Sequence, residues 1–157
     1  MTSSHRALSA RIYKDVDELQ HVVERCLDIW QQAERSGDNR YIDGVALNLH
    51  SFYTGLERIF ELIAAEVDKA LPAGPNWHQE LLRRAATPIP ELRPAIISDD
   101  LRDRLDRYRG FRHVVRNIYA FDIDRELIAP LLRDLAAVFD SAMSELTGFA
   151  DVLLSRD

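Results

Sequence analysis

Apolar residues recur at steps of three or four in three long segments of the chain. This spacing puts them on one stripe of a helix, and long helices with one apolar stripe pack into an antiparallel bundle. The alternation of apolar and polar residues that marks a strand is absent over any useful length. The sequence therefore predicts an all-α fold. The three stripes are Ile12, Val16, Leu19, Val23, Cys26 and Trp30; Val45, Leu49, Phe52, Leu56, Ile59 and Ile63; and Ile128, Leu131, Leu135, Val138, Ala142, Leu146, Phe149 and Leu153.

Turn residues predict where the first helices end. The segment Ser36-Gly37-Asp38-Asn39 reads as a tight turn after the first helix, with Gly37 suited to the left-handed C-cap position. Pro72-Ala-Gly-Pro75 is expected to stop the second helix near Leu71. Asn76, with Gln79 three residues later, resembles a capping box that opens a short helix over 77–86.

The second half of the chain is divided in the same way. Three prolines in Thr87–Pro94 forbid a helix there, so a stiff Pro-rich linker is expected at about 87–97. Ser98 or Asp99 can cap an Arg-rich helix that should run to about Tyr119, and Asp122-Ile-Asp124 breaks the chain before the last helix. We therefore predict a single domain over residues 1–157, an up-and-down bundle of four long helices and one short helix.

Composition narrows the class of protein. With 157 residues, 46% of them hydrophobic and 29% charged, the chain has the balance of one folded domain. A lone cysteine, Cys26, excludes an intramolecular disulfide and suits a reducing compartment. Because no apolar run reaches the roughly 18 residues of a membrane span and the N-terminus lacks a signal-peptide core, we expect a cytoplasmic protein without membrane contact.

The histidines do not predict a metal site. They stand at 5, 21, 50, 78 and 113, with no two of them three or four residues apart. Neither this spacing nor Cys26 provides a set of metal ligands, so we expect no metal and no cofactor. His21 and His50 fall at helix-surface positions, and His78, which follows Trp77 in the first turn of the short helix, is expected to serve local hydrogen bonding.

Charge is distributed unevenly. The net charge of −6 argues against sequence-blind nucleic-acid binding, which needs a basic surface. Yet residues 101–120 hold six arginines against two aspartates, and the chain contains 18 Arg and two Lys. Arginine makes planar, bidentate contacts with phosphate that lysine does not make. The Arg-rich helix is therefore either a phosphate-binding surface or an ordinary solvated face.

Two faces of this helix carry candidate chemistry. Arg112, Arg116 and Tyr119 share one face at i, i+4 and i+7. Two arginines four apart repel each other, so burying them together without an anion would be costly. The adjacent face carries Arg109, His113 and Asn117.

An imidazole beside guanidinium groups is suited to phosphodiester cleavage through the ribose 2′-hydroxyl. The imidazole takes the hydroxyl proton, and arginine neutralises charge on the pentacoordinate phosphate. The same spacing also fits a surface helix with an ordinary histidine. From spacing alone both interpretations stay open.

The segment 112–119, Arg-His-Val-Val-Arg-Asn-Ile-Tyr, resembles the R-x4-H-x-Y motif of HEPN-domain ribonuclease toxins of the HepT type. In that group a polar residue often follows the arginine, as His113 does here. Residues 53–64 resemble the second helix of the same group, and residues 75–82 resemble a short helix that some members carry. The likeness covers roughly residues 8–154.

The resemblance implies a metal-independent RNA endonuclease that acts on tRNA or mRNA as a homodimer, with two copies of the motif meeting at the interface. It also implies a partner, a nucleotidyltransferase antitoxin of the MNT class. In some such pairs the antitoxin transfers AMP to the motif tyrosine, which here corresponds to Tyr119. Arg112, His113 and Asn117 then stand at catalytic positions, and Arg109 and Arg116 at substrate-binding positions.

The sequence departs from the motif at Asn117, which stands where the motif has histidine. An amide cannot accept or release a proton near neutral pH, so Asn117 cannot be a general base. Two explanations compete. Either His113 has taken over, since Arg107-x5-His113 satisfies a looser spacing, or the domain is a non-catalytic HEPN module that binds a nucleotidyltransferase or a nucleotide.

Overall fold

A computed structural model describes residues 2–117 and 123–156 of the chain. The described part is all-α, as the sequence predicts, with one short π-helical turn and an isolated β-bridge between Ile89 and Arg93. The elements in chain order are α1 (Thr2–Ser36), α2 (Arg40–Ile63), η1 (Ala64–Asp68), α3 (Trp77–Ala85), α4 (Asp99–Asn117) and α5 (Arg125–Ser155).

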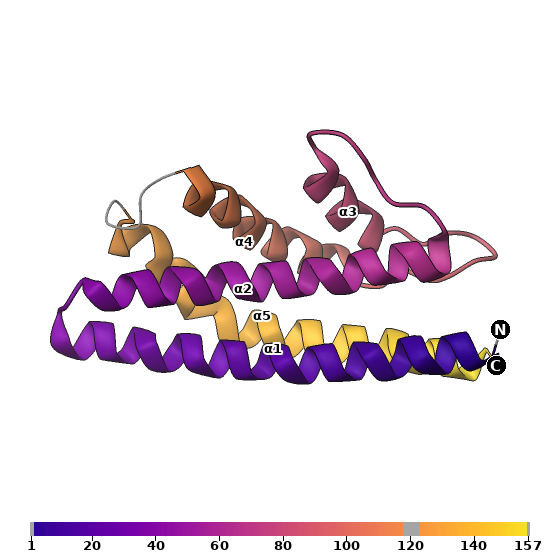
Figure 1. Cartoon of the computed structure of the whole chain (residues 1–157), viewed down its shortest axis with the longest axis horizontal. Coiled ribbons are helices and arrows are strands. Elements are labelled where there is room, and N and C mark those ends of the chain that lie inside the picture. Colours follow the sequence, from indigo (N-terminus) through magenta and orange to yellow (C-terminus); the bar gives the residue numbers. More distant parts are fainter. Residues whose placement is uncertain (1, 118–122, 157) are drawn as a thin grey trace.

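Helices α1 and α2 form a long hairpin, and α5 returns along α1 so that the two ends of the chain lie together (Figure 1). Helix α4 packs against α2 and α5. The short helix α3 contacts α2 and α4 and stands above the end of α2 (Figure 1). Helix α2 is therefore covered on two sides, by the hairpin partner on one and by α3 and α4 on the other.

The three predicted apolar stripes form the core. Every stripe residue is buried except Trp30, which is partly buried. The ring of Phe52 in α2 meets Tyr108 of α4 and Phe139 of α5 edge-on, at centroid distances of 5.5 and 6.4 Å. The Tyr108 hydroxyl donates a hydrogen bond to the Leu131 carbonyl at 2.7 Å. This cluster fixes α4 against α2 and α5, since each such ring contributes about 1.5–3 kcal/mol when fully buried.

Two glycines are required by the hairpin of α1 and α2. Gly37 has φ +67°, and its N–H donates to the Ala33 carbonyl at 3.0 Å, which is the predicted left-handed helix end. At Gly55 the two helices approach so closely that a Cβ atom would lie 2.5 Å from Cδ2 of Leu19. A side chain there would require the Leu19 side chain to move.

The second helix ends earlier than the prolines suggest. Instead of continuing to Leu71, it widens into the π turn Ala64–Asp68, and Lys69 adopts a left-handed conformation at φ +57°. The Ala70 N–H closes this end on the Ala64 carbonyl at 3.2 Å. The wide turn carries Asp68 to Arg93 of the linker, and this buried pairing sets the helix end ahead of Pro72.

The sequence predicts two helix N-caps, and the structure confirms one of them. Ser98 caps α4 by accepting a hydrogen bond from the Leu101 N–H at 3.1 Å, and Asp124 caps α5 by accepting from the Glu126 N–H at 3.0 Å. The predicted capping box at Asn76 is wrong, because within the described structure the Asn76 side chain makes no cap hydrogen bond. The backbone N–H of Trp77 bonds to the Gly74 carbonyl instead, at 3.3 Å.

Candidate functional site

Most arginines of α4 are neutralised by carboxylates. These pairs have nitrogen–oxygen distances of 2.6–3.1 Å, and they occupy the solvent-facing parts of the helix. They therefore make much of the Arg-rich segment a balanced surface, in line with the simpler of the two sequence interpretations. The pairs are Arg102 with Asp99 and Asp103, Arg104 with Asp100, Arg107 with Asp134, and Arg109 with Asp106.

Arg112 differs from these four arginines. Its Nη1 lies 3.3 Å from Nε2 of His78 in α3. Its Nε is buried and has no hydrogen-bond partner among the described residues, a feature that Nε of Arg104 shares. Arg104, however, is paired with Asp100 and Ser141 through Nη2, whereas no carboxylate in the described part of the chain forms an ion pair with Arg112. A buried guanidinium nitrogen without an acceptor is costly, so Arg112 is poised to receive an anion.

His78 is held from its other side by a buried carboxylate. Its Nδ1 lies 2.7 Å from Oε2 of Glu57 in α2, whose side chain is 4% exposed. The Trp77 ring lies against the imidazole, with a centroid distance of 3.6 Å. With Glu57 ionised, Nδ1 carries the proton and Nε2 accepts from Arg112, so these bonds select one tautomer of the neutral ring. Glu57, His78 and Arg112 thus form one hydrogen-bonded row across α2, α3 and α4.

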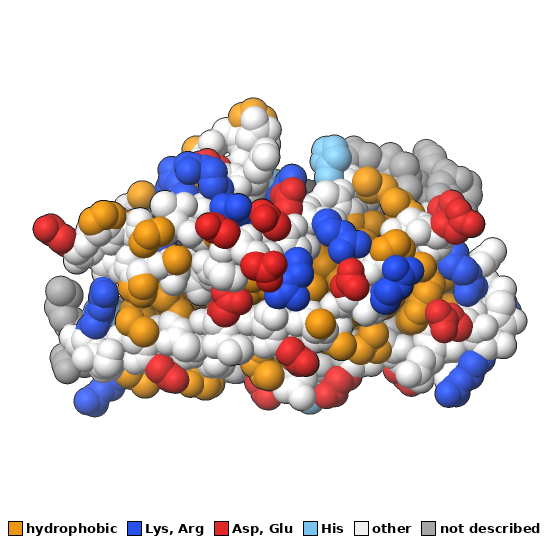
Figure 2. All heavy atoms as spheres, turned by 180° about the vertical axis from the view of Figure 1, so that it is seen from behind, with side chains coloured by type: hydrophobic (Ala, Val, Ile, Leu, Met, Phe, Trp, Pro, Cys, Tyr) orange, Lys and Arg blue, Asp and Glu red, His pale blue; other side chains and the backbone are white. Residues whose placement is uncertain are grey.

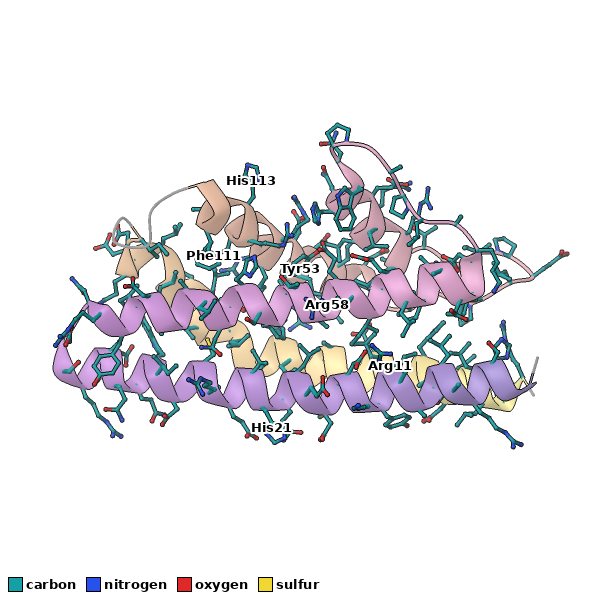
Figure 3. All side chains as sticks on the ribbon, viewed as in Figure 1. Arg11, His21, Tyr53, Arg58, Phe111 and His113 are labelled. Atoms are coloured by element: carbon teal, nitrogen blue, oxygen red, sulfur yellow. The ribbon has the colours of Figure 1, made fainter. Side chains whose placement is uncertain are left out.

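Tyr53 extends the same site along α2. Figure 3 shows its side chain on the face of α2 that α4 covers. The ring is fully buried, and its hydroxyl has no hydrogen-bond partner among the described residues. Burial, with Glu57 nearby, raises the pKa of Tyr53 well above its ordinary value, although Arg109 and Arg112 oppose that shift. The hydroxyl therefore keeps its proton at neutral pH and can act as a donor.

Glu61 adds a second carboxylate next to this row. Burial and the charge of Glu57 raise the pKa of Glu61, while His78, Arg58 and Arg112 act in the opposite direction. Two acidic groups on α2 therefore face the imidazole and the guanidinium. The site therefore combines acidic and basic groups.

The remaining predicted site residues are placed differently. His113 is exposed and projects from the outer side of α4, away from α2 (Figure 3). Arg116 and Asn117 lie in the last turn of α4, where the structure describes the backbone alone, and Tyr119 lies outside the described residues. The structure thus brings Arg112 together with His78, which sequence analysis assigned to local hydrogen bonding, and with Glu57, which it did not select.

A faint signal for Glu57 does exist in the sequence. Tyr53, Glu57 and Phe60 follow one another at helical spacing beside the main stripe of α2, and all three are buried under α3 and α4. A carboxylate within a second apolar stripe indicates a buried partner. The identity of that partner could not be read, because His78 lies 21 residues beyond Glu57 and Arg112 lies a further 34 residues along the chain.

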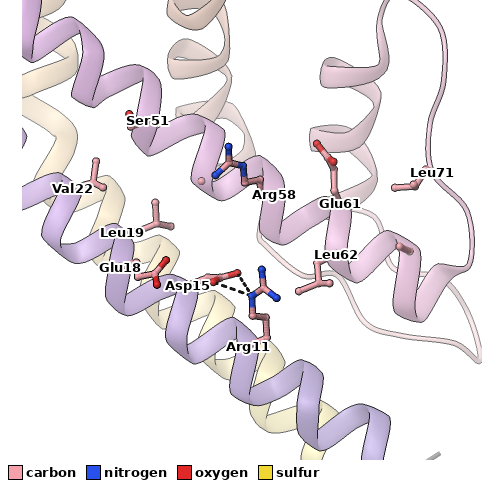
Figure 4. Close-up of a pocket in the computed structure, with 12 residues that line it drawn as sticks. Arg11, Asp15, Glu18, Leu19, Val22, Ser51, Arg58, Glu61, Leu62 and Leu71 are labelled. Atoms are coloured by element: carbon pink, nitrogen blue, oxygen red, sulfur yellow. Dashed lines mark hydrogen bonds and ion pairs between the residues drawn. The ribbon is translucent and has the colours of Figure 1, made fainter.

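Two surface grooves lie near this site. One, of about 440 Å³, lies between α3 and α4, where the molecular outline is hollowed in Figure 2; it is lined by Gln79, Leu82, Arg83, Arg102, Asp103 and Asp106. The other, of about 540 Å³, lies between α1 and α2 (Figure 4). In that groove Arg11 pairs with Asp15 at 3.2 Å, and Glu18, Arg58 and Glu61 also line it. The α3–α4 groove is lined by Gln79, the residue after His78, but none of its lining residues belongs to the row of Glu57, His78 and Arg112.

Two further observations bear on the class of site. Among the described residues, no three histidine, cysteine, aspartate or glutamate side chains gather as ligands for a metal ion. In that same part of the chain, no helix combines the length and apolar character needed to cross a membrane.

Comparison with known proteins identifies the family. The profile of the HepT-like protein family matches residues 44–153, which is more than two thirds of the chain and includes α3, α4 and most of α2 and α5. Comparisons with curated proteins and with solved structures give no match. The matched segment includes Glu57, His78 and Arg112. The chain belongs to the HepT-like protein family.

Proposed function

We propose that this protein is the toxin of a HEPN/MNT-type toxin–antitoxin system and acts as a metal-independent endoribonuclease. The observation that carries the proposal is Arg112, a half-buried arginine whose Nε has no acceptor among the described residues. Family membership and the motif-like segment that begins at Arg112 agree with it.

The chemistry needs an arginine and a proton acceptor. An imidazole removes the proton of a ribose 2′-hydroxyl, the oxygen attacks the adjacent phosphorus, and the bond to the 5′-oxygen breaks. Arg112 stabilises the extra charge on the pentacoordinate phosphate. In this proposal Arg109 and Arg116 bind neighbouring phosphates. The imidazole that sequence analysis offers for proton transfer is His113, one residue beyond Arg112.

The proposal also includes partners. The family resemblance supports a homodimer in which two copies of the motif meet, and an MNT-type nucleotidyltransferase as antitoxin. Transfer of AMP to Tyr119 would place a negative group near the arginines and prevent an RNA phosphate from binding there. Mass spectrometry after co-expression with such a nucleotidyltransferase tests this step, and an unmodified Tyr119 peptide contradicts it.

RNA cleavage in the presence of EDTA tests the activity. We expect purified protein to cut tRNA or mRNA under these conditions, and Arg112→Ala to lower the rate by about 10²–10³-fold, the usual effect of removing a group that stabilises transition-state charge. His21→Gln, an exposed position on α1, is the matched control and should retain full activity. Cleavage that Arg112→Ala leaves unchanged contradicts the proposal.

A second candidate function follows from Asn117. If the motif site has lost its base, the protein is a binding module that pairs with a nucleotidyltransferase or holds a nucleotide. The same preparation distinguishes the two functions. Protein that is inert on tRNA and mRNA but forms a stable complex with the nucleotidyltransferase supports the binding module.

A further inference from the structure

We propose that His78, supplied by α3 and held by Glu57, is the general base that accepts the 2′-hydroxyl proton at Arg112, in place of the histidine that the motif lacks at Asn117. This inference rests on the proposed endoribonuclease activity and deepens it. It assigns the proton transfer to a residue outside the motif.

The imidazole of His78 is held in one orientation. Glu57 fixes Nδ1 of His78 through a 2.7 Å bond from a position almost closed to solvent, and Trp77 covers one face of the ring. A carboxylate that accepts from one imidazole nitrogen leaves the other nitrogen unprotonated and able to take a proton. Here that nitrogen is Nε2, and it points at Arg112.

The guanidinium of Arg112 lacks a full set of hydrogen-bond acceptors within the described structure. Its contact with Nε2 is long, at 3.3 Å, and its Nε is unsatisfied within the described structure. A phosphate offers several charged acceptor oxygens and would take up these donors, which frees Nε2 of His78. Because the 2′-hydroxyl adjoins the scissile phosphate, a phosphate on Arg112 brings that hydroxyl beside Nε2.

Among the residues that the structure describes, no other side chain beside Arg112 is suited to act as the base. Tyr53 has a pKa raised by burial and stays protonated. Glu57 is buried beneath the imidazole. His113 is exposed and projects away from α2, where Arg112 and His78 meet. His78 is also 21% exposed in its side chain, which leaves the ring accessible to a substrate.

In the proposed cleavage step every bond formed is matched by a bond broken. Nε2 of His78 takes the proton of the 2′-hydroxyl, the 2′-oxygen bonds to phosphorus, and the bond from phosphorus to the 5′-oxygen breaks. The leaving 5′-oxygen takes a proton from water, and His78 returns its proton to solvent. The products are a 2′,3′-cyclic phosphate and a 5′-hydroxyl, with no metal, oxidant or co-reactant needed.

The test compares His78→Gln, His78→Ala and His21→Gln on the same tRNA and mRNA substrates in EDTA. A glutamine amide oxygen can accept from Arg112 as Nε2 does, but it cannot take a proton. If His78 is the base, both His78 variants lose about 10²–10⁴-fold in cleavage rate, while His21→Gln does not change. If His78 merely positions Arg112, His78→Gln keeps most of the activity, and that result overturns the inference.

The pH dependence gives a second measurement. For a base that must be unprotonated, the wild-type rate rises with pH across about pH 5–8, where imidazoles change charge. Glu57 and Glu61 of α2 and Arg112 of α4 are the charged groups that face the ring. We expect the residual cleavage by His78→Gln to lack this rise with pH. We also expect added imidazole to restore part of the cleavage rate of His78→Ala. A profile that His78→Gln leaves unchanged overturns the inference.

Circular dichroism and thermal unfolding confirm that the variants are folded. The outcomes separate the two proposals. Wild-type protein that cuts neither tRNA nor mRNA overturns both of them. Wild-type protein that cuts RNA through Arg112, with His78→Gln as active as wild type, overturns the role of His78 and leaves the endoribonuclease in place.

Discussion

Two arginines withdrawn from solvent, Arg93 in the linker and Arg112 in α4, have opposite surroundings. Arg93 is 3% exposed, and all three of its guanidinium nitrogens make hydrogen bonds. Arg112 has one long contact, to an imidazole, and a buried Nε without a partner among the described residues. A guanidinium that is fully satisfied holds the fold together, whereas one that is left incomplete is available to a ligand.

In the Arg93 cluster, which consists of Arg93, Asp68 and three backbone carbonyls, every guanidinium nitrogen of Arg93 has an acceptor. Its Nε and Nη2 bind the two oxygens of Asp68 at 2.6 and 2.9 Å. The remaining donors reach the backbone carbonyls of Thr87, Pro94 and Arg84 at 3.1–3.2 Å. These bonds tie the Pro-rich linker to the end of η1 and to α3. Because α3 carries His78, the Arg93 cluster also positions the candidate site.

The largest expected effect on stability comes from replacing Arg93, whose hydrogen bonds are all satisfied. Arg93→Met leaves the Asp68 carboxylate buried without its partner, so we expect the free energy of unfolding to fall by about 3–5 kcal/mol in chemical denaturation. A fall below about 1 kcal/mol would show that solvent or another cation reaches Asp68 readily.

A double substitution sharpens this result. Replacing both partners, as Arg93→Met with Asp68→Leu, removes the stranded charge, so we expect part of the lost stability to return. Equal losses in the single and double variants would mean that the carbonyl bonds of Arg93 to the linker, and not the ion pair, carry its contribution.

The same substitution at Arg112 is the direct comparison. Arg112→Met should change the free energy of unfolding by less than about 1 kcal/mol, because it removes one long contact and an unsatisfied nitrogen. Cleavage of RNA should nevertheless be lost. Denaturant unfolding and the cleavage assay, done on one preparation, separate the two roles. Equal destabilisation by Arg93→Met and Arg112→Met would remove the distinction drawn between them.

The smallest expected effect concerns a pair of buried tyrosines. Tyr53→Phe removes a hydroxyl without a partner in the described structure, so stability should stay equal or rise by up to about 1 kcal/mol. Tyr108→Phe removes a hydroxyl that donates to the Leu131 carbonyl, so stability should fall by about 0.5–1.5 kcal/mol. Thermal or denaturant unfolding measures both, and a fall for Tyr53→Phe would indicate a bound water or ligand at its hydroxyl.

Features that depend on neighbours in the chain were predicted well. The apolar stripes, the turn at Gly37 and the cap at Ser98 are local, because helical periodicity and capping involve residues within one or two turns. The end of the second helix was predicted too late, because a distant residue, Arg93, fixes the position of Asp68. The Asn76 capping box failed because Asn76 has φ −103° and ψ 24°, which is not the extended conformation that an N-cap residue usually adopts.

The sequence by itself determined the all-α architecture, the family resemblance and the choice of α4 as the helix that carries Arg112. Periodicity and a short motif suffice for these, since each is written within a single helix. The tertiary structure alone decided which residues join Arg112. Glu57, His78 and Arg112 belong to three helices, and their meeting follows from the packing of α3 and α4 over the second buried face of α2. Contacts between elements are set by how side chains fill the space between helices, and no local pattern encodes that arrangement.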